Sequence, residues 1–148
     1  MGRSMRPSIY LDTNAIIAFV EQRHAGLELL FAHAERGLVE LLTSELTLAE
    51  VLVRPLQRAE DWLLQLYEGL LVEDRVVGMK SISLDILRRS AAIRAATGGK
   101  TPDSIHVATA IAGECAYLVS SDRRLRVPEG LRKIAADEID GTLIRSWG

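Results

Sequence analysis

The sequence predicts an α/β fold with a mostly parallel sheet covered by helices on both faces. Short apolar runs that suit buried strands alternate along the chain with longer segments of helical periodicity. A chain of 148 residues is long enough to bury one core, and no repeat or low-complexity linker divides it. We therefore expect a single domain over residues 8–136, with 1–7 and 137–148 as terminal extensions.

The predicted elements alternate in type along most of the chain. The apolar runs that predict strands are 9–11, 38–43, 75–79, 117–119 and 131–135. The segments with helical periodicity are 12–20, 27–37, 44 or 47 to 55, 57–71, 83–98 and 101–115. The last stretch, 137–148, has little pattern. This alternation favours parallel strands joined by helical crossovers.

Residues with known preferences mark several helix ends. Ser83 can cap the helix that follows it, and Thr101-Pro102 combines a capping hydroxyl with a proline suited to the first helical position. Gly37 is placed to end one helix, and Pro55 helps to end another. These signals set the expected bounds of the helices.

The composition excludes several classes of protein. A hydrophobic fraction of 48% with 26% charged residues is typical of a soluble globular domain. No apolar run is long enough to span a bilayer, and none is placed like a secretory leader. Cys115 is the only cysteine, so no disulfide can form within the chain, and a reducing, cytoplasmic location is the expectation.

Two aspartates follow runs that predict strands. Asp12 comes directly after 9–11, and Asp122 follows 117–119. In open parallel sheets, ligands bind outside the carboxyl ends of the strands, where the strand order reverses. We therefore expect Asp12 and Asp122 to share a site. Each also has a structural interpretation, because Asp12 could simply cap a helix and Asp122 could simply be a turn residue.

Two further acids lie in predicted helices. Glu50 interrupts the apolar stretch 46–52, where a carboxylate needs a cation or a donor, and a pair with Arg54 would also satisfy it. Asp103 lies near the start of its helix, where the helix dipole keeps a carboxylate ionised and could be its only role. His106 follows three residues later, and such a histidine is more often packed or hydrogen-bonded than a base.

Asp12, Glu50, Asp103 and Asp122, which we call the four acids, predict a divalent-metal site. If they converge, repulsion would drive protons onto some of them unless a cation neutralises the cluster. The arginines directly behind the fourth acid are Arg123, Arg124 and Arg126. For any one of them a solvated surface is the more common explanation, but guanidinium groups at the rim of such a site suit a phosphate ligand. The net charge of −2 does not decide whether the chain binds nucleic acid.

The four acids stand in four motifs, which in order are IYLDTN at 9–14, LTLAEV at 46–51, TPDSIHVATA at 101–110 and LVSSD at 118–122. These motifs resemble those of PIN-domain nucleases, and most closely those of the VapC-type toxins of type II toxin–antitoxin pairs. Each motif is common by itself, but four in this order with family-like separations are a strong signal. The resemblance spans the chain from Ile9 to about Ala135.

The resemblance implies a fold, a chemistry and partners. It implies a PIN-like α/β/α sandwich with a five-stranded parallel sheet, a homodimer and, for a toxin, an antitoxin protein that blocks the site. It also implies that the four acids are catalytic and bind Mg²⁺ or Mn²⁺, with Thr13 or Asn14 and Ser120 in supporting positions. Many relatives have a fifth acid two residues after the fourth, followed by phenylalanine. Arg124 and Leu125 stand there instead, which favours one metal ion over two.

The functional hypothesis is therefore a metal-dependent endoribonuclease, the toxin of a toxin–antitoxin pair. A housekeeping RNA-processing nuclease with the same site, or a non-catalytic PIN-like module that binds RNA or protein, remains an alternative. A phosphatase resembling haloacid dehalogenases would need an acid two residues after Asp12, and Asn14 stands there. The chain also lacks a Walker loop, a dinucleotide glycine fingerprint and a Gly-x-Ser-x-Gly elbow.

Overall fold

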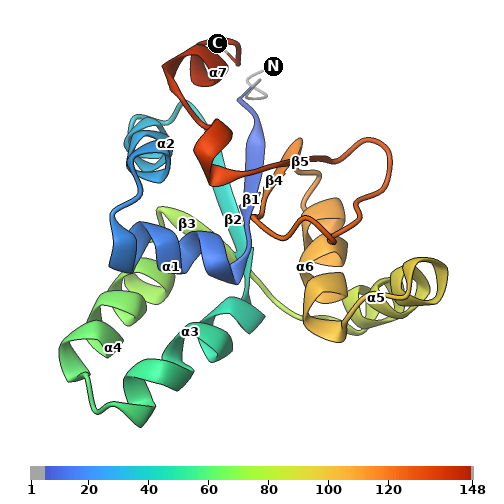
Figure 1. Cartoon of the computed structure of the whole chain (residues 1–148), viewed down its shortest axis with the longest axis horizontal. Helices are drawn as coiled ribbons and strands as arrows, with labels where there is room; N and C mark the ends of the chain where they lie inside the picture. Colours follow the sequence, from blue (N-terminus) through green and yellow to red (C-terminus); the bar gives the residue numbers. More distant parts are fainter. Residues whose placement is uncertain (1–5, 148) are drawn as a thin grey trace.

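Five parallel strands form a single sheet in the computed structural model, which describes residues 6–147 (Figure 1). The strands are β1 (Ser8–Leu11), β2 (Glu40–Ser44), β3 (Val77–Lys80), β4 (Tyr117–Val119) and β5 (Arg132–Ile134). Their order in the sheet is β3-β2-β1-β4-β5, and every neighbouring pair is parallel. The predicted fold class is confirmed.

Helices cover both faces of this sheet. They are α1 (Thr13–Gln22), α2 (Ala25–Glu35), α3 (Glu45–Gln57), α4 (Asp61–Glu68), α5 (Leu84–Thr97), α6 (Thr101–Ala112) and α7 (Gly141–Arg145), with a π-helical turn at Gly69–Glu73 and a 3-10 turn at Ala136–Glu138. Figure 1 shows α1 to α4 on one side of the sheet and α5 and α6 on the other. Among the helices of residues 6–147, none is long and apolar enough to cross a membrane.

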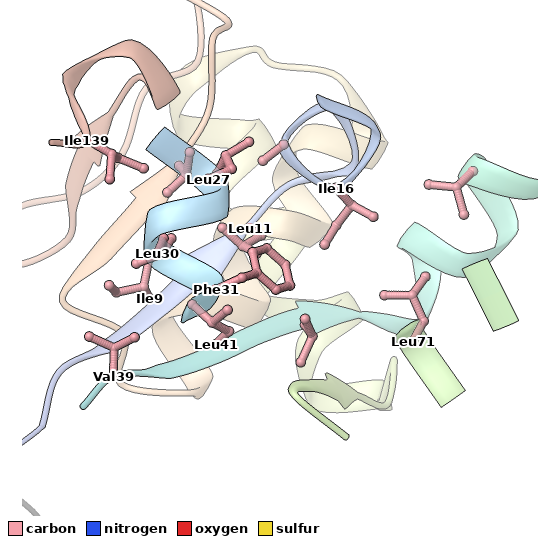
Figure 2. Close-up of a cluster of buried hydrophobic side chains, with 14 of the residues drawn as sticks. Ile9, Leu11, Ile16, Leu27, Leu30, Phe31, Val39, Leu41, Leu71 and Ile139 are labelled. Carbon is pink, nitrogen blue, oxygen red and sulfur yellow. The ribbon is translucent and has the colours of Figure 1, made fainter. Parts of the chain in front are cut away.

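Alternate residues of the strands supply two separate cores, as the two-residue period of a strand requires. On one face, Ile9 and Leu11 of β1 join the main core with side chains from α1, α2 and α4 (Figure 2). On the other face, Tyr10 belongs to a second cluster with Val107 and Ala110 of α6. The sheet is therefore buried from both sides, which explains why its strands read as short, nearly continuous apolar runs.

The strand order reverses between β1 and β4, which pair from Ile9–Tyr117 to Leu11–Val119. The strands β2 and β3 extend the sheet from one side of β1, and β5 extends it beyond β4. A crevice outside the carboxyl ends is expected at such a reversal. The residues that follow β1 and β4, including Asp12 and Asp122, lie at this edge of the sheet.

The predicted helix over 57–71 is wrong in its bounds. α3 continues through a buried Pro55 to Gln57, and α4 begins only at Asp61. The helical conformation is interrupted at Ala59, whose φ of 52° lies in the left-handed region. Pro55 is buried and lies within α3, so this proline does not end the helix.

Two other expectations also differ from the structure. Lys100, rather than Thr101, occupies the N-cap position of α6, so the Thr101 hydroxyl does not act as the cap. The stretch expected to have little pattern contains α7, capped by the side chain of Asp140, and its Ile144 is buried in the main core. Residues 1–5 of the expected N-terminal extension, and Gly148, lie outside the described residues.

Candidate functional site

Asp12 stands at the junction of β1 and α1 and is only 8% exposed. Its Oδ1 accepts a hydrogen bond from the backbone N–H of Ala15 at 2.8 Å, so it does cap α1. Burial raises the pKa of this carboxyl, while the Ala15 N–H and the Ser120 hydroxyl oppose the shift and the charge of Asp103 adds to it. Capping therefore explains the position of Asp12 without removing the cost of burying its charge.

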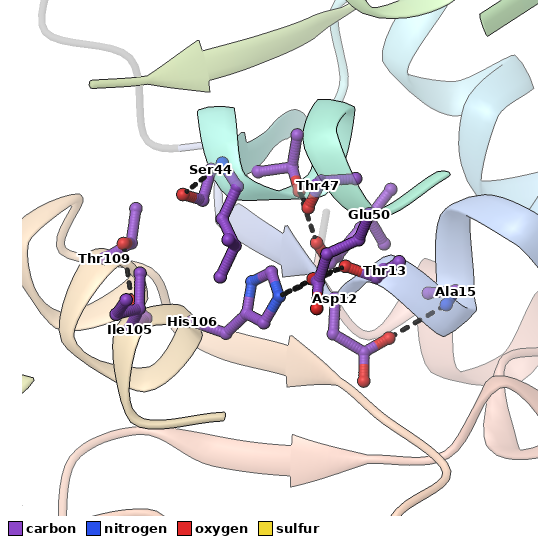
Figure 3. A network of polar contacts seen from close by, with 12 residues as sticks. Asp12, Thr13, Ala15, Ser44, Thr47, Glu50, Ile105, His106 and Thr109 are labelled. Atoms are coloured by element: carbon purple, nitrogen blue, oxygen red, sulfur yellow. Dashed lines mark hydrogen bonds and ion pairs between the residues drawn. The ribbon is translucent and has the colours of Figure 1, made fainter. Parts of the chain in front are cut away.

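Glu50 points from α3 toward the start of α1, where it meets Thr13 and His106 (Figure 3). The Thr13 hydroxyl donates to Glu50 Oε1 at 2.5 Å, and His106 Nε2 lies 3.1 Å from the same oxygen. The hydrogen bond with His106 is the main cause that lowers the pKa of Glu50. None of the ion pairs found within residues 6–147 includes Arg54, so Arg54 is not the partner of Glu50.

His106 is buried beneath this contact and is held from both ring nitrogens. The Tyr10 hydroxyl lies 2.6 Å from Nδ1, and the Thr13 hydroxyl lies 3.1 Å from Nε2. Burial raises the pKa of Tyr10, so its hydroxyl keeps its proton and can donate to Nδ1. With that assignment Nε2 carries the imidazole proton and directs it toward Glu50. His106 is therefore the packed, hydrogen-bonded histidine that the sequence predicts, and its contact with Glu50 ties it to the acids.

Asp103 and Asp122 lie around one cavity of about 540 Å³. Asp103 is in the first turn of α6, and burial raises the pKa of its carboxyl, with the charge of Asp122 as the next cause. Asp122 Oδ1 accepts a hydrogen bond from the backbone N–H of Arg124 at 2.9 Å, so this acid does shape a turn. The turn also directs it into the same cavity as Asp103.

Asp103 interacts electrostatically with each of the other three acids, but the four do not form a ready-made metal cage. Beyond the effect of burial, the charges of Asp122 and Glu50 raise the pKa of Asp103, and the charge of Asp103 raises the pKa of Asp12. Across residues 6–147, however, no three acidic, histidine or cysteine side chains are arranged closely enough to hold a metal ion. The donor set still fits Mg²⁺ or Mn²⁺, which take carboxylate oxygens and retain water. A cation would also relieve the charge that burial disfavours on Asp12.

The other residues expected at the site fall into separate surroundings. Asn14 and Ser120 line a cavity of about 350 Å³ beside the start of α1. Arg124 and Arg126 line the larger cavity together with Asp103 and Asp122, whereas Arg123 is exposed and does not line it.

Comparisons with known proteins identify the family of this arrangement. The family model described as "PIN domain" matches residues 9–131. A search of curated proteins found no match.

Solved structures that share the fold include chains of three complexes. A chain of a toxin–antitoxin complex from Klebsiella pneumoniae has 24% identity and a TM-score of 0.63, covering 86% of this chain and 97% of that one. A chain of VapBC2 from Rickettsia felis, bound to a promoter DNA fragment, has 15% identity and a TM-score of 0.65, covering 86% and 98%. A chain of DNA-bound VapBC from Salmonella typhimurium has 18% identity and a TM-score of 0.71, covering 88% and 98%.

Proposed function

The chain belongs to the PIN domain family, and we propose that it is a Mg²⁺- or Mn²⁺-dependent endoribonuclease that hydrolyses RNA phosphodiester bonds. The observation that carries the proposal is that, at the edge where the strand order reverses, Asp103 interacts electrostatically with each of the other three acids. Such a cluster would repel a phosphodiester unless a cation lay between them. Cationic side chains beside the same acids suit a polyanionic substrate.

The four acids would hold the divalent ion, partly through water. A bound ion supplies a water of lowered pKa and stabilises negative charge on the leaving oxygen. The cap on α1 fixes the place of Asp12, and the contacts with Thr13 and His106 keep Glu50 ionised and oriented. A carboxylate of the cluster would orient the attacking water. Because a fifth acid is missing where Arg124 stands, we propose one firmly held ion.

Arg124 and Arg126 would bind the RNA backbone next to the acids. Contacts of guanidinium groups with phosphates position a strand but do not read its sequence. Sequence-specific recognition of RNA mostly targets unpaired bases, so we propose single-stranded or loop RNA as the substrate. Asn14 and Ser120, which line the smaller cavity beside the start of α1, would support the site there.

The test is RNA cleavage by the wild type and by Asp12→Asn, with Mg²⁺, Mn²⁺ or a chelator. Asparagine caps helices as well as aspartate does, so the variant keeps α1 while losing a metal ligand. We expect cleavage to fall by about a hundredfold or more in the variant, and chelator to abolish it in the wild type. Asp61→Asn, which changes an exposed acid in α4, is the matched control. Equal cleavage by Asp12→Asn and the wild type would exclude this function.

We further propose that the protein is the toxin of a toxin–antitoxin pair, acting in the cytoplasm as a homodimer. The structural neighbours come from toxin–antitoxin complexes, which supports a protein partner. The apolar side chains exposed on α3 and α4 suit such contacts, and they include Val53, Leu56, Trp62 and Leu66. Growth arrest on expression, absent with Asp12→Asn, is the expected result. A housekeeping nuclease would cleave RNA without arresting growth.

A further inference from the structure

The cavity that contains Asp103 and Asp122 extends well beyond these two acids. On one side it is lined by the end of α5 and the connection to α6, from Ile93 to Lys100, and on the other by Arg124 to Arg126. Its volume of about 540 Å³ falls within the range of small-molecule sites. Asp103 and Asp122 are two of its twelve lining residues, so much of the cavity is available for another part of the substrate.

The lining combines cations with an apolar floor. Lys100, Arg124 and Arg126 are exposed at the cavity, and the ion pairs found within residues 6–147 do not include them. Ile93 and Leu125 are partly buried and pack against the core cluster beneath α6. A charged rim over aliphatic side chains matches a nucleotide, which carries an anionic phosphate and a flat base.

Hydrogen bonds hold both walls in place in the free protein. The side chain of Arg94 donates to the Gly99 carbonyl at 2.9 Å, and the Ser104 hydroxyl donates to the Lys100 carbonyl at 3.0 Å. Opposite them, Lys133 Nζ donates to the carbonyl of Asp122 at 2.9 Å and to that of Leu125 at 2.8 Å. Because these walls are already ordered before binding, little conformational entropy is lost when a ligand binds, which favours a specific subsite.

We propose that this cavity binds one unpaired nucleotide of the RNA strand, next to the phosphodiester bond that is cleaved. Its base rests on Ile93 and Leu125, and its phosphate lies against Arg124 and Arg126. The inference rests on the proposed ribonuclease function and adds to it a site that selects the nucleotide beside the cut. Bases of different size and polarity would fill the cavity unequally, so cleavage would prefer certain bases at this position.

The test uses nucleoside 5′-monophosphates, ribose 5-phosphate and inorganic phosphate as probes of the whole protein, in chelator and therefore without cleavage. Dissociation constants are measured by NMR titration. We expect at least one nucleotide to bind about tenfold more tightly than ribose 5-phosphate, because only the nucleotide brings a base to the apolar floor. Leu125→Ala should reduce this preference while leaving the binding of inorganic phosphate unchanged.

The neighbouring arginines provide a matched comparison. Arg124→Ala and Arg126→Ala should each weaken nucleotide binding by about threefold or more, while Arg123→Ala should not, since Arg123 does not line the cavity. Equal affinity for nucleotides and ribose 5-phosphate, or an equal effect of all three arginine variants, would overturn the subsite. A lack of metal-dependent cleavage would instead reject the ribonuclease function, whatever the nucleotides do.

Discussion

Glu50 shows how neighbouring side chains can hold a candidate metal ligand ready. Its Oε1 accepts from the Thr13 hydroxyl and faces His106 Nε2, and these contacts keep its pKa below the ordinary value of 4.5. Tyr10 in turn fixes the ring of His106 from below. The orientation of Glu50 therefore depends on residues of β1, α1 and α6 at once. Changing any of these residues should disturb the orientation of the Glu50 carboxylate, although Glu50 itself is unchanged.

Replacing Thr13 tests this dependence. Thr13→Val removes the donating hydroxyl with little change of shape, so we expect the pKa of Glu50 to rise and metal-dependent cleavage to fall by about tenfold. Thr13→Ser keeps a hydroxyl and should retain most of both properties. The pKa is measured by NMR of the glutamate carboxyl carbons as a function of pH. An unchanged Glu50 titration in Thr13→Val would contradict the role given to the hydroxyl.

Single residues differed in how far the sequence could reveal their roles. Asp12 and Asp122 were recognisable because each follows a strand, and parallel strands end at one edge. His106 was expected to be packed or hydrogen-bonded, but its partners were not predictable, because Tyr10 and Glu50 are distant in the chain and only the fold brings them to its ring. The sequence also did not show that Arg124 and Arg126 line the cavity while Arg123 does not, since adjacent residues in a turn point in different directions.

At the level of elements, local signals predicted most helices and strands but not the α3–α4 region. Ser83 caps α5 as expected, since a cap needs only the next three residues. Pro55 was expected to end α3, but its burial depends on distant residues and keeps it inside the helix. In α4, Leu63 and Tyr67 face the core, whereas Trp62 is 61% exposed. Apolar character alone did not separate these faces.

The C-terminal helix gives a prediction at this scale. Ile144 of α7 is 5% exposed and lies in the main core, so Ile144→Ala should lower the free energy of unfolding by about 2–4 kcal/mol. Thr142→Ala changes an exposed position of the same short helix and serves as the control. Chemical denaturation measures both. If the two variants are equally stable, α7 does not contribute to the core in the way described.

Considered as a whole, the molecule brings four negative charges together at the edge where its strand order reverses. No local pattern requires this, because the adjacency of β1 and β4 is a property of the complete sheet. The folded chain therefore carries a cost at the site, because burial raises the pKa values of Asp12 and Asp103 and the charges of neighbouring acids add to the shift. A cost of this kind is expected where a protein is built to bind a cation.

The pH dependence of stability should reveal this cost. The pKa values of Asp12 and Asp103 lie above the ordinary 3.8 in the folded state, so without metal the folded protein binds these protons more tightly. The contribution of Asp12 and Asp103 to the free energy of unfolding therefore falls as the pH rises from 3.8 through their pKa values in the folded state. Glu50 has the opposite effect. It stabilises the folded state above pH 4.5, and this stabilisation is lost as the pH falls through its lowered pKa.

Divalent ions should reverse the effect of Asp12 and Asp103 at neutral pH. Binding to the folded state alone stabilises it by about 2.7 kcal/mol when the free ion is at about 100 times its dissociation constant. We therefore expect Mg²⁺ or Mn²⁺ to raise the midpoint of thermal unfolding by about 5–10 °C at pH 7. The shift should shrink as acid protonates Asp12 and Asp103, because a protonated carboxyl competes with the metal.

Asp12→Asn separates this account from a general effect of ionic strength. Without metal the variant should be at least as stable as the wild type, since it keeps the cap on α1 and removes a buried charge. With metal it should lose most of the stabilising shift, whereas NaCl of matched ionic strength should shift neither protein. An equal metal-induced shift in both proteins would mean that the ion binds elsewhere. The four acids would then be a structural cluster, stabilised by their caps and hydrogen bonds alone.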